Sequence, residues 1–170
     1  MSRLWTVPRT LFYGTFYRLP PRWRRRLARL GSVKYILGAV ILVRATDPGP
    51  ERLVLVRQPP GRAWSLPAGL LKRNEPAIDA AARELAEETG IRVSTGDLAP
   101  AQPTAVVHHR GRWVDIVFEA RVPVGTPLTP DGAEIVGVAW HRLDDLPPLT
   151  PAAARLLANY DIGPLARANE

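Results

Sequence analysis

Three glutamates spaced to share one face of a helix are the residues of this sequence best suited to chemistry. Residues 77–89 are rich in Ala and Glu, carry apolar residues at helical spacing, and are followed by Gly90, which predicts a helix end. On such a helix Glu84, Glu87 and Glu88 fall within an arc of about 100°. These carboxylates repel one another unless a cation lies among them, and oxygen ligands without His or Cys suit Mg²⁺ or Mn²⁺. The spacing is compatible with a metal site for phosphate chemistry, and a solvated helix face is the alternative, which is the more common case for a Glu-rich helix taken alone.

The stretch from Gly69 to Ile91 resembles the Nudix box. That motif runs glycine, five residues, glutamate, seven residues, Arg-Glu, an aliphatic residue, any residue, Glu-Glu, any residue, glycine and an aliphatic residue, and all of its specified positions match here. The preceding Trp64-Ser-Leu-Pro-Ala-Gly69 is similar to MutT-type members. The resemblance implies a hydrolase that cleaves a nucleoside diphosphate linked to another group, with Mg²⁺ as cofactor or Mn²⁺ in its place.

The resemblance also implies a role for each matched residue. The implied metal ligands are three carboxylates and one backbone carbonyl: Glu84, Glu87, Glu88 and Ala68. Arg83 would orient the catalytic carboxylates through charge-assisted contacts. Glu75 would lie near the metal as an orienting group or a general base. Asn74 stands where the family often has glycine, and because Asn tolerates left-handed backbone we expect the turn to be kept.

Further candidates lie outside the box. Glu134 falls where some MutT-type members place another metal ligand or general base; a surface carboxylate is the alternative, and Glu119 is a rival for the role. Three basic side chains are candidate phosphate contacts: Arg57, Lys72 and Arg73. His108 and His109 are adjacent on a predicted strand and face opposite sides, so we do not expect them to bind one ion together, although one could contact substrate.

The elements that must position these residues follow from hydrophobic patterning. Predicted strands cover residues 35–44, 53–58, 104–109, 112–122 and 134–141, and predicted helices cover 77–89 and 151–159. The first two strands pair most simply as a hairpin, and Arg110-Gly111 predicts a turn between the third and fourth. These elements indicate an α/β fold, and the resemblance specifies a Nudix-type α/β/α sandwich with a mixed sheet and the box as a loop-helix-loop unit.

Charge divides the chain into parts. The net charge is +7, yet ten of the 23 basic residues precede Asp47, the first acidic residue, so the body is mildly acidic. We expect three parts: a basic, aromatic N-terminal extension over residues 1–32, a Nudix hydrolase domain over 33–160, and a C-terminal tail over 161–170. The absence of Cys excludes disulfides, cysteine nucleophiles and thiolate metal sites.

The extension has three interpretations. Leu4, Trp5, Leu11, Phe12 and other large apolar residues alternate with arginines, and a helix is predicted from about residue 21 to 30. The segment could lie on an anionic membrane surface, bind nucleic acid, or pack on the domain or on a second copy in a homodimer. The longest apolar run, residues 35–43, is shorter than the ~20 residues of a spanning helix, and no signal-peptide pattern occurs, so a cytoplasmic protein is the expectation.

Substrate choice is the least determined property. We expect a small-molecule nucleotide, with (deoxy)nucleoside triphosphates first and nucleotide sugars or ADP-ribose next. A Nudix module that senses nucleotides without catalysis is the alternative from a different class. Thr150 stands where members specific for oxidised guanine carry an amide side chain, so the resemblance does not extend to that specificity.

Overall fold

The chain forms two compact units, Met1–Lys34 and Tyr35–Glu170. The computed structural model describes residues 14, 16–109, 111–130 and 132–166; the predicted apolar positions Leu4, Trp5, Leu11 and Phe12 lie outside the described residues. In the first unit, helix α2 spans Pro21–Gly31, with proline in its first turn as predicted. Among the described helices, none combines the length and apolar character needed to cross a membrane.

The second unit is built on a six-stranded mixed sheet. Its elements are β1 (Ile36–Ala45), β2 (Arg52–Arg57), β3 (Ala68–Leu70), α3 (Ala77–Thr89), the 3₁₀ turn η1 (Thr95–Asp97), β4 (Ala99–His108), β5 (Trp113–Val122), β6 (Gly137–Arg142) and α4 (Pro151–Ala158). The strand order is β4-β5-β1-β2-β6, and β3 also pairs with β1. Strands β1 and β5 are parallel, and the remaining pairs are antiparallel.

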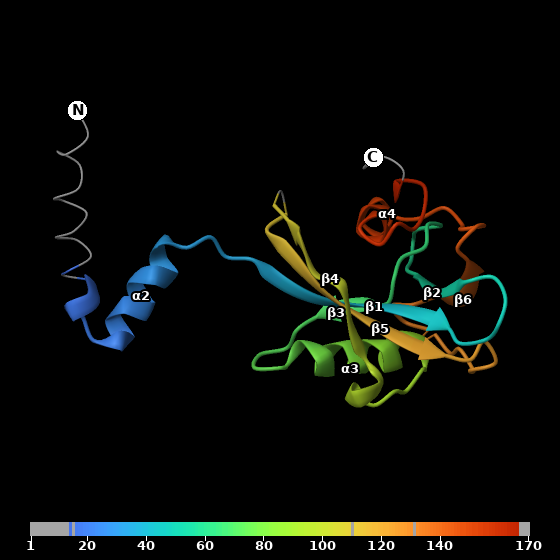
Figure 1. Ribbon diagram of the computed structural model, residues 1–170, viewed down its shortest axis with the longest axis horizontal. Helices are drawn as coiled ribbons and strands as arrows, with labels where there is room; N and C mark the ends of the chain where they lie inside the picture. Colours follow the sequence, from blue (N-terminus) through green and yellow to red (C-terminus); the bar gives the residue numbers. More distant parts are fainter. Residues whose placement is uncertain (1–13, 15, 110, 131, 167–170) are drawn as a thin grey trace. The chain divides into compact units, whose positions relative to one another are not determined.

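Helices cover both faces of this sheet (Figure 1). On β1, Ile41 belongs to the core that includes Leu85 of α3, whereas its neighbour Leu42 belongs to the core that includes Leu157 of α4. Because successive side chains of a strand point to opposite faces, β1 needs apolar residues at every position, which explains its unbroken buried run. The α/β/α sandwich with a mixed sheet is confirmed.

The hairpin expected from the first two strands forms only in part. Strands β1 and β2 are antiparallel, but their paired register is the single match Arg44↔Leu53. At the other end of β1, the same edge pairs with β3 from Gly38 to Val40. The β4–β5 hairpin forms as predicted, although β4 begins earlier and Arg110 of its turn lies outside the described residues.

Strand β6 begins at Gly137 rather than at Glu134, so Glu134 precedes the strand. Helix α3 has the predicted bounds and α4 ends one residue before the predicted end. The core also extends past residue 160, because Ile162 is buried in the cluster on the side of α4.

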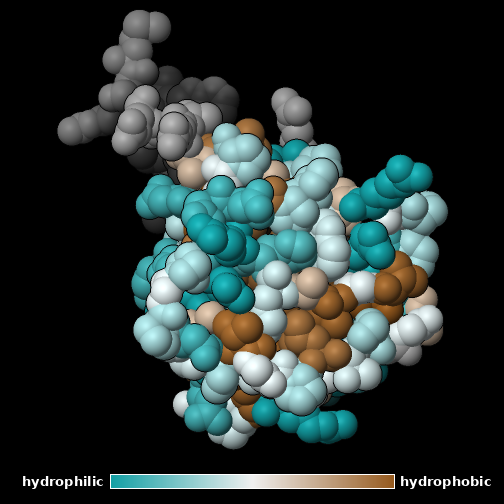
Figure 2. Space-filling model, turned by 90° about the vertical axis from the view of Figure 1, so that its right-hand side faces the viewer, coloured by the Kyte–Doolittle hydropathy of each residue, from teal (hydrophilic) through white to brown (hydrophobic). Residues whose placement is uncertain are grey.

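The surface in Figure 2 is a mixture of hydrophilic and hydrophobic residues, with the hydrophobic ones gathered across its lower half.

The attachment of α3 to the sheet can be tested through Leu85, which has no exposed surface. We expect Leu85→Ala to lower the free energy of unfolding by about 2–5 kcal/mol, because it removes buried methyl groups and leaves a cavity. Leu70→Ala is the matched control, since the Leu70 side chain is 51% exposed and its loss should change stability by about 0.5 kcal/mol or less. Urea denaturation of the full chain measures both, and equal effects would contradict this packing.

Candidate active site

The loop between β3 and α3 brings Glu75 next to the helix. Asn74 has the left-handed φ of 63° that the sequence predicted for this turn. The backbone N–H of Lys72 donates to Glu75 Oε2 at 2.7 Å, which closes the loop on itself. At the C-terminal end of α3, Gly90 adopts φ 77° and its N–H donates to Ala86 O. The helix therefore ends at Thr89, one residue after Glu88.

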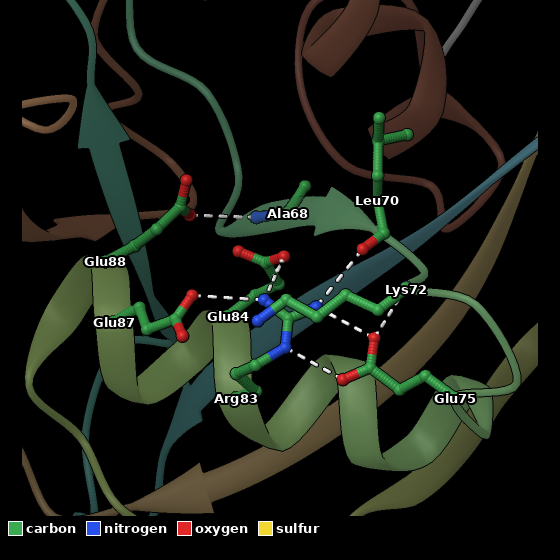
Figure 3. A network of polar contacts seen from close by, with 8 residues as sticks. All are labelled: Ala68, Leu70, Lys72, Glu75, Arg83, Glu84, Glu87 and Glu88. Atoms are coloured by element: carbon green, nitrogen blue, oxygen red, sulfur yellow. Dashed lines mark hydrogen bonds and ion pairs between the residues drawn. The ribbon is translucent and has the colours of Figure 1, made fainter.

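Arg83 ties this loop to the carboxylates of α3 (Figure 3). Its Nε and Nη2 donate to the two oxygens of Glu75 at 2.8 and 3.0 Å, a forked, charge-assisted pair. Its Nη1 donates to Glu84 Oε1 at 2.5 Å and to Glu87 Oε2 at 3.0 Å. Nη2 also donates to the carbonyl of Leu70 at 3.1 Å. These contacts use all five N–H donors that a guanidinium possesses.

Glu88 is held separately from this network. It is only 6% exposed, and its Oε2 accepts a hydrogen bond from the backbone N–H of Ala68 at 2.9 Å. A buried carboxylate needs such donors to offset its lost hydration. Glu88 therefore links the end of α3 to the start of β3 (Figure 3).

Gly69 allows a close approach between β3 and Glu84. A Cβ built on Gly69 would overlap the Glu84 carboxylate, so any larger residue at this position would displace that side chain. Glu84 is also half-enclosed, with 14% of its side chain exposed. The absence of a side chain at Gly69 is thus what leaves room for this carboxylate against the backbone.

The electrostatics of the network keep its charges fixed. Hydrogen bonds from Arg83 and from the Lys72 backbone lower the pKa of Glu75 from 4.5 to about 2. Hydrogen bonds to Glu75, and then to Glu84 and Glu87, raise the pKa of Arg83 above its already high value. Both groups are therefore ionised across the physiological pH range.

The donor set fits a hard divalent cation, since three carboxylates supply only oxygen and Gly69 leaves space beside one of them. Within the residues that the structure describes, no three acidic, histidine or cysteine side chains already lie together as a metal cluster. The reason is visible in the contacts: Arg83 holds Glu84 and Glu87, and Ala68 holds Glu88. Arg83 supplies the positive charge that this helix face requires.

The structure does not join the two further acidic candidates to this network. Glu134 is exposed, and Gln58 Nε2 donates to its Oε1 at 3.2 Å. Glu119 lies on β5 with Arg44 Nε at 3.4 Å. Its position two residues after Val117 directs it to the side of α4, so the sheet separates Glu119 from the carboxylates of α3.

The candidate phosphate contacts lie in different places. Lys72 and Arg73 are exposed in the β3–α3 loop, next to the network. Arg57 lies at the end of β2 instead, with its guanidinium carbon 5.4 Å from the centre of the Trp64 ring. Trp64 also contacts His141 edge-on, at 4.5 Å between ring centres, and burial lowers the pKa of that histidine. Arg57 thus contacts an aromatic pair beside the sheet rather than the residues of the box.

A cavity of about 730 Å³ lies on the side of the sheet that α4 covers, and the candidate list from sequence missed most of its polar wall. His108 Nε2 is 2.9 Å from Asp115 Oδ2, and the indole N–H of Trp113 donates to the other oxygen of Asp115. Asp115 could have been found as a carboxylate two residues from the buried Val117, on the same strand face. Ala68 also lines the cavity, which therefore reaches the residue that holds Glu88.

Two other residues discussed from the sequence lie at this cavity or beside it. His109 also lines the cavity, but its Nδ1 is 3.5 Å from the Tyr35 hydroxyl, so the two histidines have different partners. Thr150 is the N-cap of α4, and its hydroxyl oxygen accepts from the N–H of Ala153 at 3.2 Å. That hydroxyl is committed to the helix end.

Known proteins resemble the chain across this whole region. Residues 34–160 match the NUDIX domain. The mRNA-decapping enzyme subunit 2 of Arabidopsis thaliana is 35% identical over 114 residues, 66% of this chain and 29% of that protein. The 8-oxo-dGDP phosphatase NUDT18 of Danio rerio is 32% identical over 142 residues, 81% of this chain and 40% of that protein. This chain thus spans less than half the length of these two curated relatives.

A solved structure shares the fold. The NUDIX domain of NrtR from Shewanella oneidensis, crystallised with ADP ribose, superposes with a TM-score of 0.61 at 17% identity. The match covers 87% of this chain and 95% of that chain. The likeness supports the layered arrangement described above.

The Arg83–Glu75 pair predicts a specific pH dependence. Because folding lowers the pKa of Glu75 from 4.5 to about 2, its ionised form stabilises the folded state fully above pH 4.5, and this contribution is lost as the pH falls toward 2. We expect Arg83→Gln to return the pKa of Glu75 toward 4.5, as measured by carbon-detected NMR titration without divalent cations. Arg92→Gln, an exposed arginine just past α3, should leave it unchanged. A pKa that stays near 2 in Arg83→Gln would contradict the assigned cause.

Proposed function

Because this chain belongs to the Nudix family, we propose that it is a divalent-metal-dependent pyrophosphohydrolase that cleaves nucleoside diphosphate-linked substrates, with (deoxy)nucleoside triphosphates first among them. The observation that carries the proposal is the Arg83 network. It gathers Glu75, Glu84 and Glu87 around one guanidinium, beside the buried Glu88. A helix face that is merely solvated would not require a saturated, half-buried arginine.

In the proposed site Glu84, Glu87 and Glu88 would hold the cation, and the carbonyl of Ala68 would supply a further oxygen. When bound, Mg²⁺ or Mn²⁺ would polarise a phosphoryl oxygen, lower the pKa of a bound water and offset the charge of the leaving group. Arg83 would orient Glu84 and Glu87 through its charge-assisted hydrogen bonds. Lys72 and Arg73, in the adjacent loop, are positioned to meet substrate phosphates.

Glu75 acts in this proposal as an orienting group. A general base works best when its pKa lies near the working pH, and a carboxyl with a pKa of about 2 is a weak base. Its two oxygens are also engaged by Arg83 and by the loop backbone. Glu134, exposed on the segment before β6, stays a candidate for the base.

The cavity beside Ala68 is the proposed site for the nucleoside. Its volume of about 730 Å³ lies within the range of small-molecule sites, and an apolar wall with a few polar groups is typical of them. The Asp115 carboxylate and the His108 ring offer hydrogen-bonding groups for a base or sugar. Thr150 does not line this cavity, and its hydroxyl oxygen accepts from the N–H of Ala153 at the start of α4.

The named relatives support nucleotide substrates without choosing one. One is named for an 8-oxo-dGDP phosphatase activity and another for mRNA decapping, both directed at nucleotide phosphates. ADP-ribose and nucleotide sugars remain the next candidates. The motif is complete here, which favours catalysis over the nucleotide-sensing alternative.

A substrate panel tests the proposal directly. We expect release of phosphate or pyrophosphate from nucleoside triphosphates, with nucleotide sugars, ADP-ribose and capped RNA as comparisons, to require Mg²⁺ or Mn²⁺ and to stop with EDTA. Glu88→Gln should lower kcat/KM by about 100-fold or more, the usual scale for losing one group that stabilises the transition state. Asp79→Asn is the matched control, since Asp79 is exposed on the first turn of the same helix.

Turnover that survives both EDTA and Glu88→Gln would overturn the proposed chemistry. Tight nucleotide binding with no turnover of any compound would instead support the sensing alternative. Folding of each variant is checked by its urea denaturation midpoint, so that a lost activity is not a lost fold.

The cavity makes a separate prediction about substrate affinity. Ala152 is exposed at the cavity wall on α4, so Ala152→Trp should obstruct the cavity without entering the core. We expect KM to rise about tenfold or more while kcat changes little, because the carboxylates are untouched. Ala99→Trp, at an exposed position at the start of β4, is the control. An unchanged KM in Ala152→Trp would place the nucleoside elsewhere.

A further inference from the structure

Helix α2 separates apolar and cationic side chains onto different faces. At about 100° per residue, Trp23, Leu27 and Leu30 fall within an arc of about 60°. Four of the five arginines of this helix occupy a second arc of about 100°: Arg22, Arg25, Arg26 and Arg29. Arg24 lies outside that arc, on the other side of the apolar residues. The helix is therefore amphipathic, with an apolar stripe bordered by arginines.

The apolar face of α2 is in contact with water. Trp23 is 48% exposed, Leu27 46% and Leu30 84%, and α2 contains no buried residue. Exposed large apolar residues gathered on one stripe are costly in water and indicate a surface that is covered in use. Two described aromatic side chains of this unit contact arginines: the guanidinium carbon of Arg26 lies 5.3 Å from the Trp23 ring centre, and that of Arg24 lies 5.9 Å from the Tyr17 ring centre.

The charge of this segment indicates which kind of partner surface α2 would bind. The first 34 residues contain nine basic residues and no acidic one, so the whole segment around α2 attracts a polyanion. A single-stranded nucleic acid would explain the arginines and Trp23, because bases stack on aromatic rings. It would not explain two leucines beside the tryptophan, since aliphatic side chains offer no stacking face. An anionic lipid surface uses both faces at once, with leucine and tryptophan in the acyl boundary and arginine among the phosphates.

We propose that α2 is a peripheral membrane anchor that lies in the plane of an anionic phospholipid surface. Trp23, Leu27 and Leu30 enter the boundary between headgroups and acyl chains. The arginine face stays at the level of the lipid phosphates, and the aliphatic stems of those arginines extend along the apolar surface. With 11 residues the helix buries little area, so binding is reversible and depends on charge as well as on the apolar face.

This inference does not depend on the proposed hydrolase activity. None of the residues that it uses belongs to the box, the cavity or the sheet, and all lie within the first compact unit. The two proposals can therefore fail separately. A hydrolase without membrane affinity and a membrane-bound protein without turnover are both distinct results.

Vesicle sedimentation of the full chain tests the anchor. We expect the protein to sediment with phosphatidylcholine vesicles that contain phosphatidylglycerol and to remain in solution with phosphatidylcholine alone. Replacing Arg25, Arg26 and Arg29 with Gln should weaken binding on the order of 100-fold, at roughly fivefold for each cation removed near an anionic surface. Arg62, Arg92 and Arg121, all exposed in the second unit, are changed to Gln as the charge-matched control.

The apolar face has its own test. Leu27→Gln with Leu30→Gln keeps every charge and should also abolish vesicle binding, whereas a purely electrostatic attraction would survive it. Because α2 has no buried residue, these changes should leave the urea denaturation midpoint of the second unit unchanged. Fluorescence anisotropy with single-stranded RNA is measured on the same variants.

Three results would overturn the anchor: no sedimentation with anionic vesicles, sedimentation that is unaffected by the leucine variant, or RNA binding that needs the arginines while vesicles are ignored. Vesicle binding lost in both α2 variants and retained in the control would establish it.

Discussion

Repulsion among carboxylates on one turn of helix is the constraint that organises this domain. Glu84, Glu87 and Glu88 lie close in sequence and share a face, so an isolated helix with this sequence would be destabilised by its own charges. The positive charge of Arg83 offsets this repulsion, and all five of its N–H donors are used. Two of these donors bind Glu75 in the preceding loop. One guanidinium therefore ties the loop, through Glu75, and the end of β3, through the carbonyl of Leu70, to α3.

The sheet separates the acidic helix face from the cavity, and the two approach one another at β3. The carboxylates belong to α3 on one face, and the cavity with Asp115 lies on the other, under α4. Ala68 is common to both, because its backbone holds Glu88 while it also lines the cavity. Under the proposed function, substrate phosphates would lie at the acidic side and the nucleoside at the cavity side. The two sides can then vary independently, as expected when specificity is grafted onto a shared scaffold.

Local patterns predicted local structure well and long-range pairing less well. The bounds of α3 and the left-handed turn at Asn74 followed from capping and backbone preferences that act over a few residues. The division of β1 between β2 and β3 did not follow, because nothing local distinguishes a strand that pairs along its whole edge from one that shares it. Similarly, the sequence suggested Glu119 as a rival for Glu134, but only the face of β5 shows that the sheet lies between Glu119 and α3.

The contact between Glu88 and Ala68 has a consequence for how the protein tolerates change. The donor is a backbone N–H, so the side chain at position 68 is irrelevant to the bond, and any residue that fits the space keeps it. Proline is the exception, since it alone has no N–H. Almost any single substitution of Ala68 would therefore leave the hydrogen bond to the buried Glu88 carboxylate in place. Natural variation at this position can reshape the cavity wall without disturbing the acidic side of the domain.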